Sequence, residues 1–258
     1  MELPVNHFKR AIASDKTPLG VWLMSAAPST AEALGCAGFD FLVVDMEHTP
    51  IDTPQMIGIL QTIAGTPAQA IVRPPWNDMV MVKRALDAGA MSLLFPFVQN
   101  ADEAARAVAY TRYPPHGVRG VAGTHRGSRY GTIPNYLTRA NDEICVIVQI
   151  ETRDALGHLE AIAAVDGVDG LFIGPNDLAA GMGHLGDSAH ADVRQAIEDA
   201  VRRIRAAGKA AGILAPIEAD ARHWLACGCT LVAVGSDVGL LARQSEALAA
   251  TFKDAASR

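Results

Sequence analysis

Two carboxylates, Glu151 and Asp177, each stand where a short apolar run of the chain ends. The runs are ICVIVQIE at 144–151 and VDGLFIGPND at 168–177. If both runs are parallel β-strands, their carboxyl ends meet at one rim, and the two side chains lie close together. Carboxylate oxygens are hard ligands that suit Mg²⁺ or Mn²⁺. The spacing therefore predicts metal-assisted chemistry on a small, oxygen-rich substrate.

Other polar residues interrupt apolar runs at the same end. They are Asp45, Glu47, His48, Arg73, Gln149 and Asn176. Gln149 and Glu151 are two residues apart on one strand, so both side chains point to the same side, toward the axis of a barrel. A polar side chain buried there needs partners, because unpaired burial costs several kcal/mol. A bound cation and its ligand would supply those partners.

Several of these residues also have a purely structural explanation. Glu151 could form a structural ion pair with Arg73. Asp177 could cap a helix that starts at Leu178, and His48 could be a loop histidine bonded to the backbone. All of these explanations would have to coincide on one rim by chance, and we therefore favour a functional site.

The elements that position these residues are eight apolar runs that alternate with helical patterns. Their near-continuous hydrophobicity is typical of parallel strands covered on both faces. The chain has no G-x-G-x-x-G turn of the kind that a doubly wound sheet uses. We therefore expect a single (β/α)₈ TIM barrel over residues 1–258. The expected strands are 19–25, 39–46, 68–74, 90–98, 144–151, 168–174, 210–215 and 231–236.

Capping residues and glycines predict the helix boundaries. The expected helices are one capped by Ser29 or Thr30, one capped by Asp78, one opened by Asp102, and one over 192–208 that ends on Gly208. A further helix around 6–15 should cover the lower mouth of the barrel. The long connection 114–143 carries Arg119, Arg126, Arg129 and Arg139. It could receive an acidic aldehyde, although a solvated or inter-subunit loop is the interpretation that we favour.

Composition excludes several classes of function. The net charge of −6 over 258 residues argues against nucleic acid or an anionic membrane as partner. No apolar run is long enough to span a membrane, and the N-terminus lacks a signal-peptide core, so we expect a cytoplasmic protein. The cysteines Cys36, Cys145, Cys227 and Cys229 are expected to be buried, reduced thiols. Cys227-Gly228-Cys229 alone is weak evidence for metal binding.

Two other barrel chemistries fit poorly. A Schiff-base aldolase needs a lysine amine at the active-site mouth. None of the lysines stands at the carboxyl end of an expected strand; they are Lys9, Lys16, Lys83, Lys209 and Lys253. A catalytic zinc site would require several histidines or thiolates near His48, and the sequence shows no such group.

Seven segments together resemble the HpcH/HpaI aldolase family, the metal-dependent class II pyruvate aldolases. They are VVDMEHTP (43–50), IVRPP (71–75), ALDAGA (85–90), YPPHGVRG (113–120), VIVQIET (146–152), GLFIGPNDLAAGMGHLG (170–186) and AGILA (211–215). The resemblance implies that Glu151 and Asp177 are metal ligands for Mg²⁺, Mn²⁺ or Co²⁺. It also implies that Gln149, Arg73 and the backbone at Asn176 and Asp177 contact a pyruvate moiety.

The same resemblance implies roles in proton transfer and assembly. His48 matches the family's base, Arg73 an arginine that stabilises charge on the substrate oxygen, and Asp87 an aspartate that raises the basicity of the histidine. Asp87 falls at the end of a helix near the lower rim, so a neighbouring subunit could be involved. Family members are typically hexamers that exchange a C-terminal helix, here around 241–252.

The expected function is reversible, metal-dependent aldol cleavage of a 4-hydroxy-2-oxo acid. The products are pyruvate, or hydroxypyruvate, and an aldehyde. One alternative is a citrate-lyase-like enzyme that acts on an acyl-CoA thioester. A second alternative is a non-catalytic barrel that binds an oxo acid.

Overall fold

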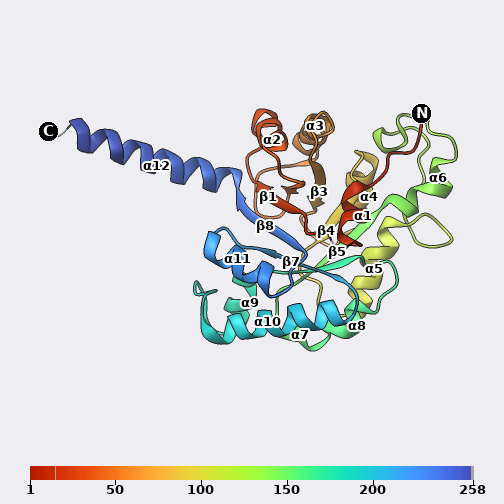
Figure 1. Ribbon diagram of the computed structural model, residues 1–258. Coiled ribbons are helices and arrows are strands. Elements are labelled where there is room, and N and C mark those ends of the chain that lie inside the picture. The colour runs from red at the N-terminus through yellow and green to blue at the C-terminus, as the bar shows by residue number, and fades with distance from the viewer. Residues whose placement is uncertain (15, 257–258) are drawn as a thin grey trace.

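A computed structural model describes residues 1–14 and 16–256 of the chain. In it, eight parallel strands close into a barrel in chain order (Figure 1). They are β1 Leu19–Leu23, β2 Phe41–Asp45, β3 Gln69–Arg73, β4 Ser92–Phe95, β5 Cys145–Ile150, β6 Gly170–Ile173, β7 Ala210–Leu214 and β8 Leu231–Ser236. The pair Leu19↔Val232 joins β1 to β8 and closes the barrel. The expected (β/α)₈ fold is confirmed, and each expected run contains a strand.

Helices cover the outer face of the barrel (Figure 1). They are α2 Pro28–Gly35, α3 Thr53–Ile63, α4 Met79–Asp87, α5 Ala101–Thr111, α7 Arg153–Gly157, α8 Leu159–Ala163, α9 Pro175–Gly181, α10 Ala191–Ala206 and α11 Glu218–Ala226. A large apolar core lies between helices and strands, and a second core fills the barrel interior. Helix α1, His7–Ile12, extends the interior core because Phe8 and Ile12 pack into it. The expected N-terminal helix is confirmed, with Phe8 packed edge-on against Phe41 at 5.4 Å.

The helix caps differ in part from expectation. Asp78 caps α4 by accepting hydrogen bonds from two backbone N–H groups, as expected. Helix α2 begins earlier than predicted, with Pro28 in its first turn and Ala27 as its cap, because proline fits the first turn of a helix. The cap of α5 is Asn100, not Asp102, which lies in the first turn.

The connection 114–143 is folded against the barrel. It contains the short helices η1 Arg126–Ser128, α6 Tyr136–Arg139 and η2 Ala140–Glu143. The buried guanidinium of Arg119 pairs with Asp87 at 2.8 Å, and Arg126 donates to the carbonyls of Leu60 and Ala88. These arginines therefore hold the connection in place.

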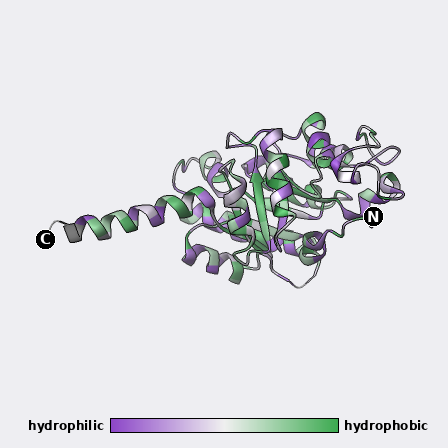
Figure 2. Cartoon of the chain, turned by 90° about the horizontal axis from the view of Figure 1, so that it is seen from above, coloured by the Kyte–Doolittle hydropathy of each residue, from purple (hydrophilic) through white to green (hydrophobic). Residues whose placement is uncertain are grey.

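Helix α12, Asp237–Ala256, projects away from the barrel (Figure 1). Apolar and polar residues alternate along its length, as Figure 2 shows. Its exposed large apolar side chains are Val238, Leu240, Leu241, Leu248 and Phe252. Over the described ranges, no helix, α12 included, combines the length and hydropathy of a membrane span.

Candidate active site

A cavity of about 230 Å³ opens at the carboxyl ends of the strands. Its wall includes six of the predicted site residues, namely His48, Arg73, Gln149, Glu151, Asn176 and Asp177. Asp45, Trp22 and Phe172 add to its polar and aromatic lining. Strands β2, β3, β5 and β6 thus bring together side chains that lie far apart in the sequence.

Arg73 is held rigidly by carboxylates of the preceding strand and loop. Its Nε and Nη2 donate to the two oxygens of the fully buried Asp45, both at 2.8 Å. Its Nη1 lies 2.8 Å from Glu47 and 3.3 Å from Gln149 Oε1. A two-point contact of this kind fixes the plane of the guanidinium as well as its position. Arg73 is therefore not the ion-pair partner of Glu151, and the structural explanation of Glu151 is wrong.

Glu151 is buried and accepts two hydrogen bonds. Gln149 Nε2 donates to Oε2 at 3.2 Å, and the backbone N–H of Phe97 donates to Oε1 at 2.7 Å. Phe97 has a φ of 55°, which is rare for a residue other than glycine, and this conformation turns its N–H toward the carboxylate. This contact could not be predicted, because nothing in the sequence marks a left-handed phenylalanine.

Asp177 is the third residue of α9, after the cap Gly174. It is therefore not the helix cap, which removes that structural explanation. Asp177 is exposed. Burial raises the pKa of Glu151, and the negative charges of Glu47 and Asp177 add to that rise. The charge of Asp177 therefore acts on Glu151 across the cavity.

The charges of the cavity fit a divalent cation. Arg73 neutralises part of the charge of Asp45 and Glu47. Among the described residues, Glu151 and Asp177 have no cationic side chain in ion-pair contact. Two such carboxylates at the mouth of a small cavity are the hard ligands that Mg²⁺ and Mn²⁺ prefer.

Gly174 leaves the space that Glu151 occupies. A Cβ at this position would stand 2.4 Å from Glu151 Oε2 and 2.8 Å from its Cβ. Contacts this short force the Glu151 side chain to move, although the φ of −95° at Gly174 is open to any residue. Gly174 thus positions a predicted ligand, and only the three-dimensional approach of the two segments makes this visible.

We expect Gly174→Ala to weaken Mn²⁺ binding and activity together, by at least about tenfold, because displaced ligands bind metal less well. Titration with Mn²⁺ and a cleavage assay measure both quantities. Gly181→Ala on the same helix is the matched control, since a Cβ there meets nothing within 4 Å. Unchanged Mn²⁺ affinity in Gly174→Ala would place Glu151 outside the metal site.

Glu47 bridges His48 and Arg73. Its Oε2 lies 3.8 Å from His48 Nε2 and 2.8 Å from Arg73 Nη1. Burial raises the pKa of Glu47, and the charges of Arg73 and His48 oppose that rise. The His48 side chain is 62% exposed at the mouth, where it can reach a substrate. Within the described residues it makes no backbone hydrogen bond, so the loop explanation of His48 is not supported.

Asp87 lies elsewhere, at the end of α4 on the outside of the barrel. Its carboxylate pairs with Arg119 at 2.8 Å and lies 3.7 Å from His125 Nε2. It does not line the cavity, and a single subunit does not bring it to His48. Its role as a partner of His48 therefore remains a prediction that depends on a neighbouring subunit.

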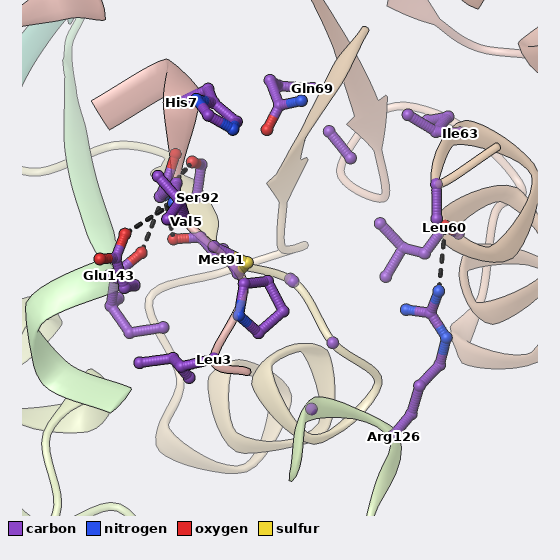
Figure 3. A pocket seen from close by; sticks show the side chains of 18 of the residues that line it. Leu3, Val5, His7, Leu60, Ile63, Gln69, Met91, Ser92, Arg126 and Glu143 are labelled. Carbon is purple, nitrogen blue, oxygen red and sulfur yellow. Dashed lines mark hydrogen bonds between the residues drawn. The ribbon is translucent and has the colours of Figure 1, made fainter. Parts of the chain in front are cut away.

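A larger cavity, of about 320 Å³, lies at the opposite, amino ends of β3 and β4. Figure 3 shows its wall, with Leu3 and Val5 of the N-terminal segment facing Leu60 and Ile63 of α3. Its carboxylate is already paired: Glu143 accepts from the backbone N–H of Asn6 at 2.6 Å and from Arg10 at 2.9 Å. This cavity offers no arrangement comparable to the carboxylate and arginine cluster at the other end.

Burial raises the pKa of Glu151 to about 7, well above its ordinary value of 4.5. The folded protein therefore holds this proton more tightly than the unfolded chain, and the resulting stabilisation is lost as pH rises through 7. We expect metal-free protein to lose on the order of 2–3 kcal/mol between about pH 5 and pH 8 from this group. Glu151→Gln should remove that loss, as urea unfolding at both pH values can test. Identical pH dependence in the two proteins would show that Glu151 does not titrate this way.

Comparison with known proteins agrees with the fold and identifies the family. The HpcH/HpaI aldolase/citrate lyase family model matches residues 18–244, and the chain belongs to this family. It is 52% identical to a pyruvate aldolase of Rhizobium etli over 98% of this chain and 99% of that one. It is 50% identical to a 5-keto-4-deoxy-D-glucarate aldolase of Salmonella paratyphi C over 96% and 97% of the two chains.

A solved structure supports the same conclusion. A protein of this family from Burkholderia cenocepacia superposes with a TM-score of 0.94 at 41% identity, covering 96% of this chain and all of that one. The resemblance expected from the sequence is thus confirmed. The protein is an enzyme, a carbon–carbon lyase of the aldolase class.

Proposed function

We propose that the enzyme catalyses reversible, divalent-metal-dependent aldol cleavage of 4-hydroxy-2-oxo acids to pyruvate, or hydroxypyruvate, and an aldehyde. The observation that carries the proposal is the cavity in which Glu151 and Asp177 stand beside a rigid Arg73. The names of the two aldolase relatives support the same reaction type.

Each residue has a part in this proposal. Glu151 and Asp177 hold the cation, and Gln149 with the backbone at Asn176 and Asp177 contacts the oxo acid. The cation supplies Lewis-acid stabilisation of the negative charge that develops on the 2-oxo oxygen during cleavage. Mg²⁺, Mn²⁺ and Co²⁺ are the candidates, since the ligands are oxygen atoms.

His48 accepts the proton of the 4-hydroxyl group in the cleavage direction. The 4-oxygen then forms the aldehyde carbonyl as the C3–C4 bond breaks, and the electron pair of that bond passes into the enolate of the oxo acid. Its exposed position at the mouth suits contact with the part of the substrate farthest from the metal. Glu47 lies beside both His48 and Arg73 and so connects the base to the guanidinium. Arg73 stabilises the enolate that remains, from a position fixed by Asp45.

We also propose a homo-oligomer in which α12 packs on a neighbouring subunit. The helix leaves the barrel with five large apolar side chains exposed, an arrangement that association of subunits would bury. A hexamer is the assembly that the family resemblance implies. Asp87 would then be available to a neighbour's site.

Exchange of pyruvate methyl protons in deuterated water tests the proposed reaction. With Mg²⁺, we expect the enzyme to remove the methyl signal in the proton NMR spectrum, because the enolate forms without an aldehyde. A panel of aldehydes with pyruvate and hydroxypyruvate as donors then identifies the substrates. Absence of exchange, together with turnover of an acyl-CoA thioester, would favour the citrate-lyase-like alternative.

We expect Arg73→Lys to lower kcat by about 10²–10³, although it keeps the positive charge. Lysine lacks the planar fork that binds Asp45 through two nitrogens, so the charge loses its fixed position. Steady-state kinetics separate kcat from KM, and the loss should fall mainly on kcat. A fully active Arg73→Lys enzyme would assign Arg73 a structural role only.

A further inference from the structure

We propose that Glu198, His223 and Cys227 form a second metal site, one that binds Zn²⁺ on the outer surface of the barrel. His223 and Cys227 lie one turn apart at the end of α11, and Glu198 faces them from α10. None of the three lines the active-site cavity. The site is therefore independent of the proposed aldol chemistry.

The contacts converge on one atom. His223 Nε2 lies 3.0 Å from Glu198 Oε1 and 3.4 Å from Cys227 Sγ. A proton relay through an imidazole uses one ring nitrogen for the carboxylate and the other for the nucleophile. Here both partners approach the same nitrogen, so the three residues cannot act as a nucleophilic triad. A shared cation explains this convergence better than a relay does.

The separations fit zinc. Zn–N distances of 2.0–2.1 Å and a Zn–S distance of 2.3 Å in a tetrahedron place neighbouring ligand atoms roughly 3.3–3.6 Å apart. Two of the observed separations are close to these values, and all three ligand atoms lie within 4.8 Å of one another.

Charge and access also suit a dication. A thiolate and a carboxylate supply two negative charges, and neutral imidazole supplies the third ligand. The nearby Arg194 does not compete, because it pairs with Asp220 at 2.7 Å. The side chains of Glu198 and His223 are 46% and 34% exposed, so zinc can enter and water can take the fourth position.

The two proposed zinc ligands at the end of α11 follow the spacing H-x-x-x-C (His223 and Cys227). The C-x-C pair of the sequence, Cys227 and Cys229, does not supply both ligands. Cys229 is 2% exposed and belongs to the core between helices and strands. Its buried thiol is not part of the group formed by Glu198, His223 and Cys227. His223, one turn before Cys227, places its Nε2 beside the Cys227 thiol. A thiolate and an imidazole select Zn²⁺ or Co²⁺ over Mg²⁺, which prefers oxygen.

Cobalt binding tests the proposal. Metal-free enzyme is first given saturating Mg²⁺, which occupies oxygen-ligand sites, and is then titrated with Co²⁺ as the spectroscopic probe. We expect one equivalent to bind with a near-ultraviolet thiolate-to-cobalt absorption band, which Zn²⁺ removes by displacing the cobalt. We expect Cys227→Ser to abolish the band, and His223→Asn and Glu198→Gln to weaken Co²⁺ binding by more than about tenfold.

Matched variants make the result specific. Cys36→Ser removes an exposed thiol of α2's C-terminal end and should leave the band unchanged. His190→Ala alters a second histidine group, in which the stacked rings of His184 and His190 lie 3.5 Å apart, and should also leave it unchanged. The proposal is overturned if no band forms in the wild-type enzyme, or if the band survives in Cys227→Ser. Circular dichroism checks folding, and His223→Asn and Glu198→Gln still decide the question if Cys227→Ser does not fold.

Discussion

His48→Ala should remove aldol cleavage while leaving metal affinity nearly intact. Loss of a general base typically lowers the rate by about 10²–10⁴. His48 follows β2, whereas the proposed ligands Glu151 and Asp177 come from β5 and from α9 after β6. Because different elements supply the two functions, a change in one should leave the other in place. The measurement pairs the cleavage rate with Mn²⁺ affinity for the same protein.

Glu151→Gln provides the contrast. It removes a charged ligand, so metal affinity and activity should fall together. His116→Ala serves as the matched control, since His116 is an exposed histidine of the connection before β5 and does not line the cavity. If His48→Ala cannot hold metal, His48 is a ligand and not a base. If it retains full cleavage activity, the base lies elsewhere.

The polar rim of the barrel could be predicted because it follows from a regular property of the fold. Parallel strands end on the same side, so a carboxylate such as Glu151, after an apolar run, can be placed relative to Asp177 without coordinates. The same logic placed His48, Arg73 and Gln149 at one cavity, as observed.

Features that depend on backbone conformation or close approach could not be predicted. The N–H that Phe97 donates to Glu151 requires a left-handed phenylalanine, which its sequence neighbours do not favour. The need for glycine at position 174 arises only where that residue meets the Glu151 side chain. The sequence places Asp87 near the lower rim of the barrel, and the structure agrees, since Asp87 ends α4 just before β4. The predicted contact between Asp87 and His48 therefore cannot form within one subunit.

The exposure of individual aromatic and sulfur side chains also does not follow from their hydrophobicity. Trp76 and Phe97 are 55% and 39% exposed and pack on each other at 5.8 Å. Cys36 was expected to be buried and is exposed. These residues lie at the ends of elements, where the side that a residue faces depends on how the chain turns, and hydrophobicity alone does not specify that.

Exhaustive chelation should abolish turnover, and Mg²⁺, Mn²⁺ or Co²⁺ should restore it. Glu151 and Asp177 offer only oxygen ligands, and neither is neutralised by a cationic side chain among the described residues. Arg73 cannot replace the missing cation, because Asp45 and Glu47 already hold its guanidinium. Without the dication, the developing negative charge on the 2-oxo oxygen loses its main stabilisation.

Two controls separate loss of metal from loss of structure and from an alternative mechanism. Circular dichroism of the chelated protein should be unchanged, because the apolar clusters that hold the barrel together do not include Glu151 or Asp177. Borohydride with pyruvate should leave the protein mass unchanged, since no lysine lines the cavity and none is placed to form a Schiff base. Full turnover after exhaustive chelation would contradict the metal-dependent mechanism. Trapping of pyruvate on a lysine would replace it with covalent catalysis, in which the carboxylates of the cavity would serve only to move protons.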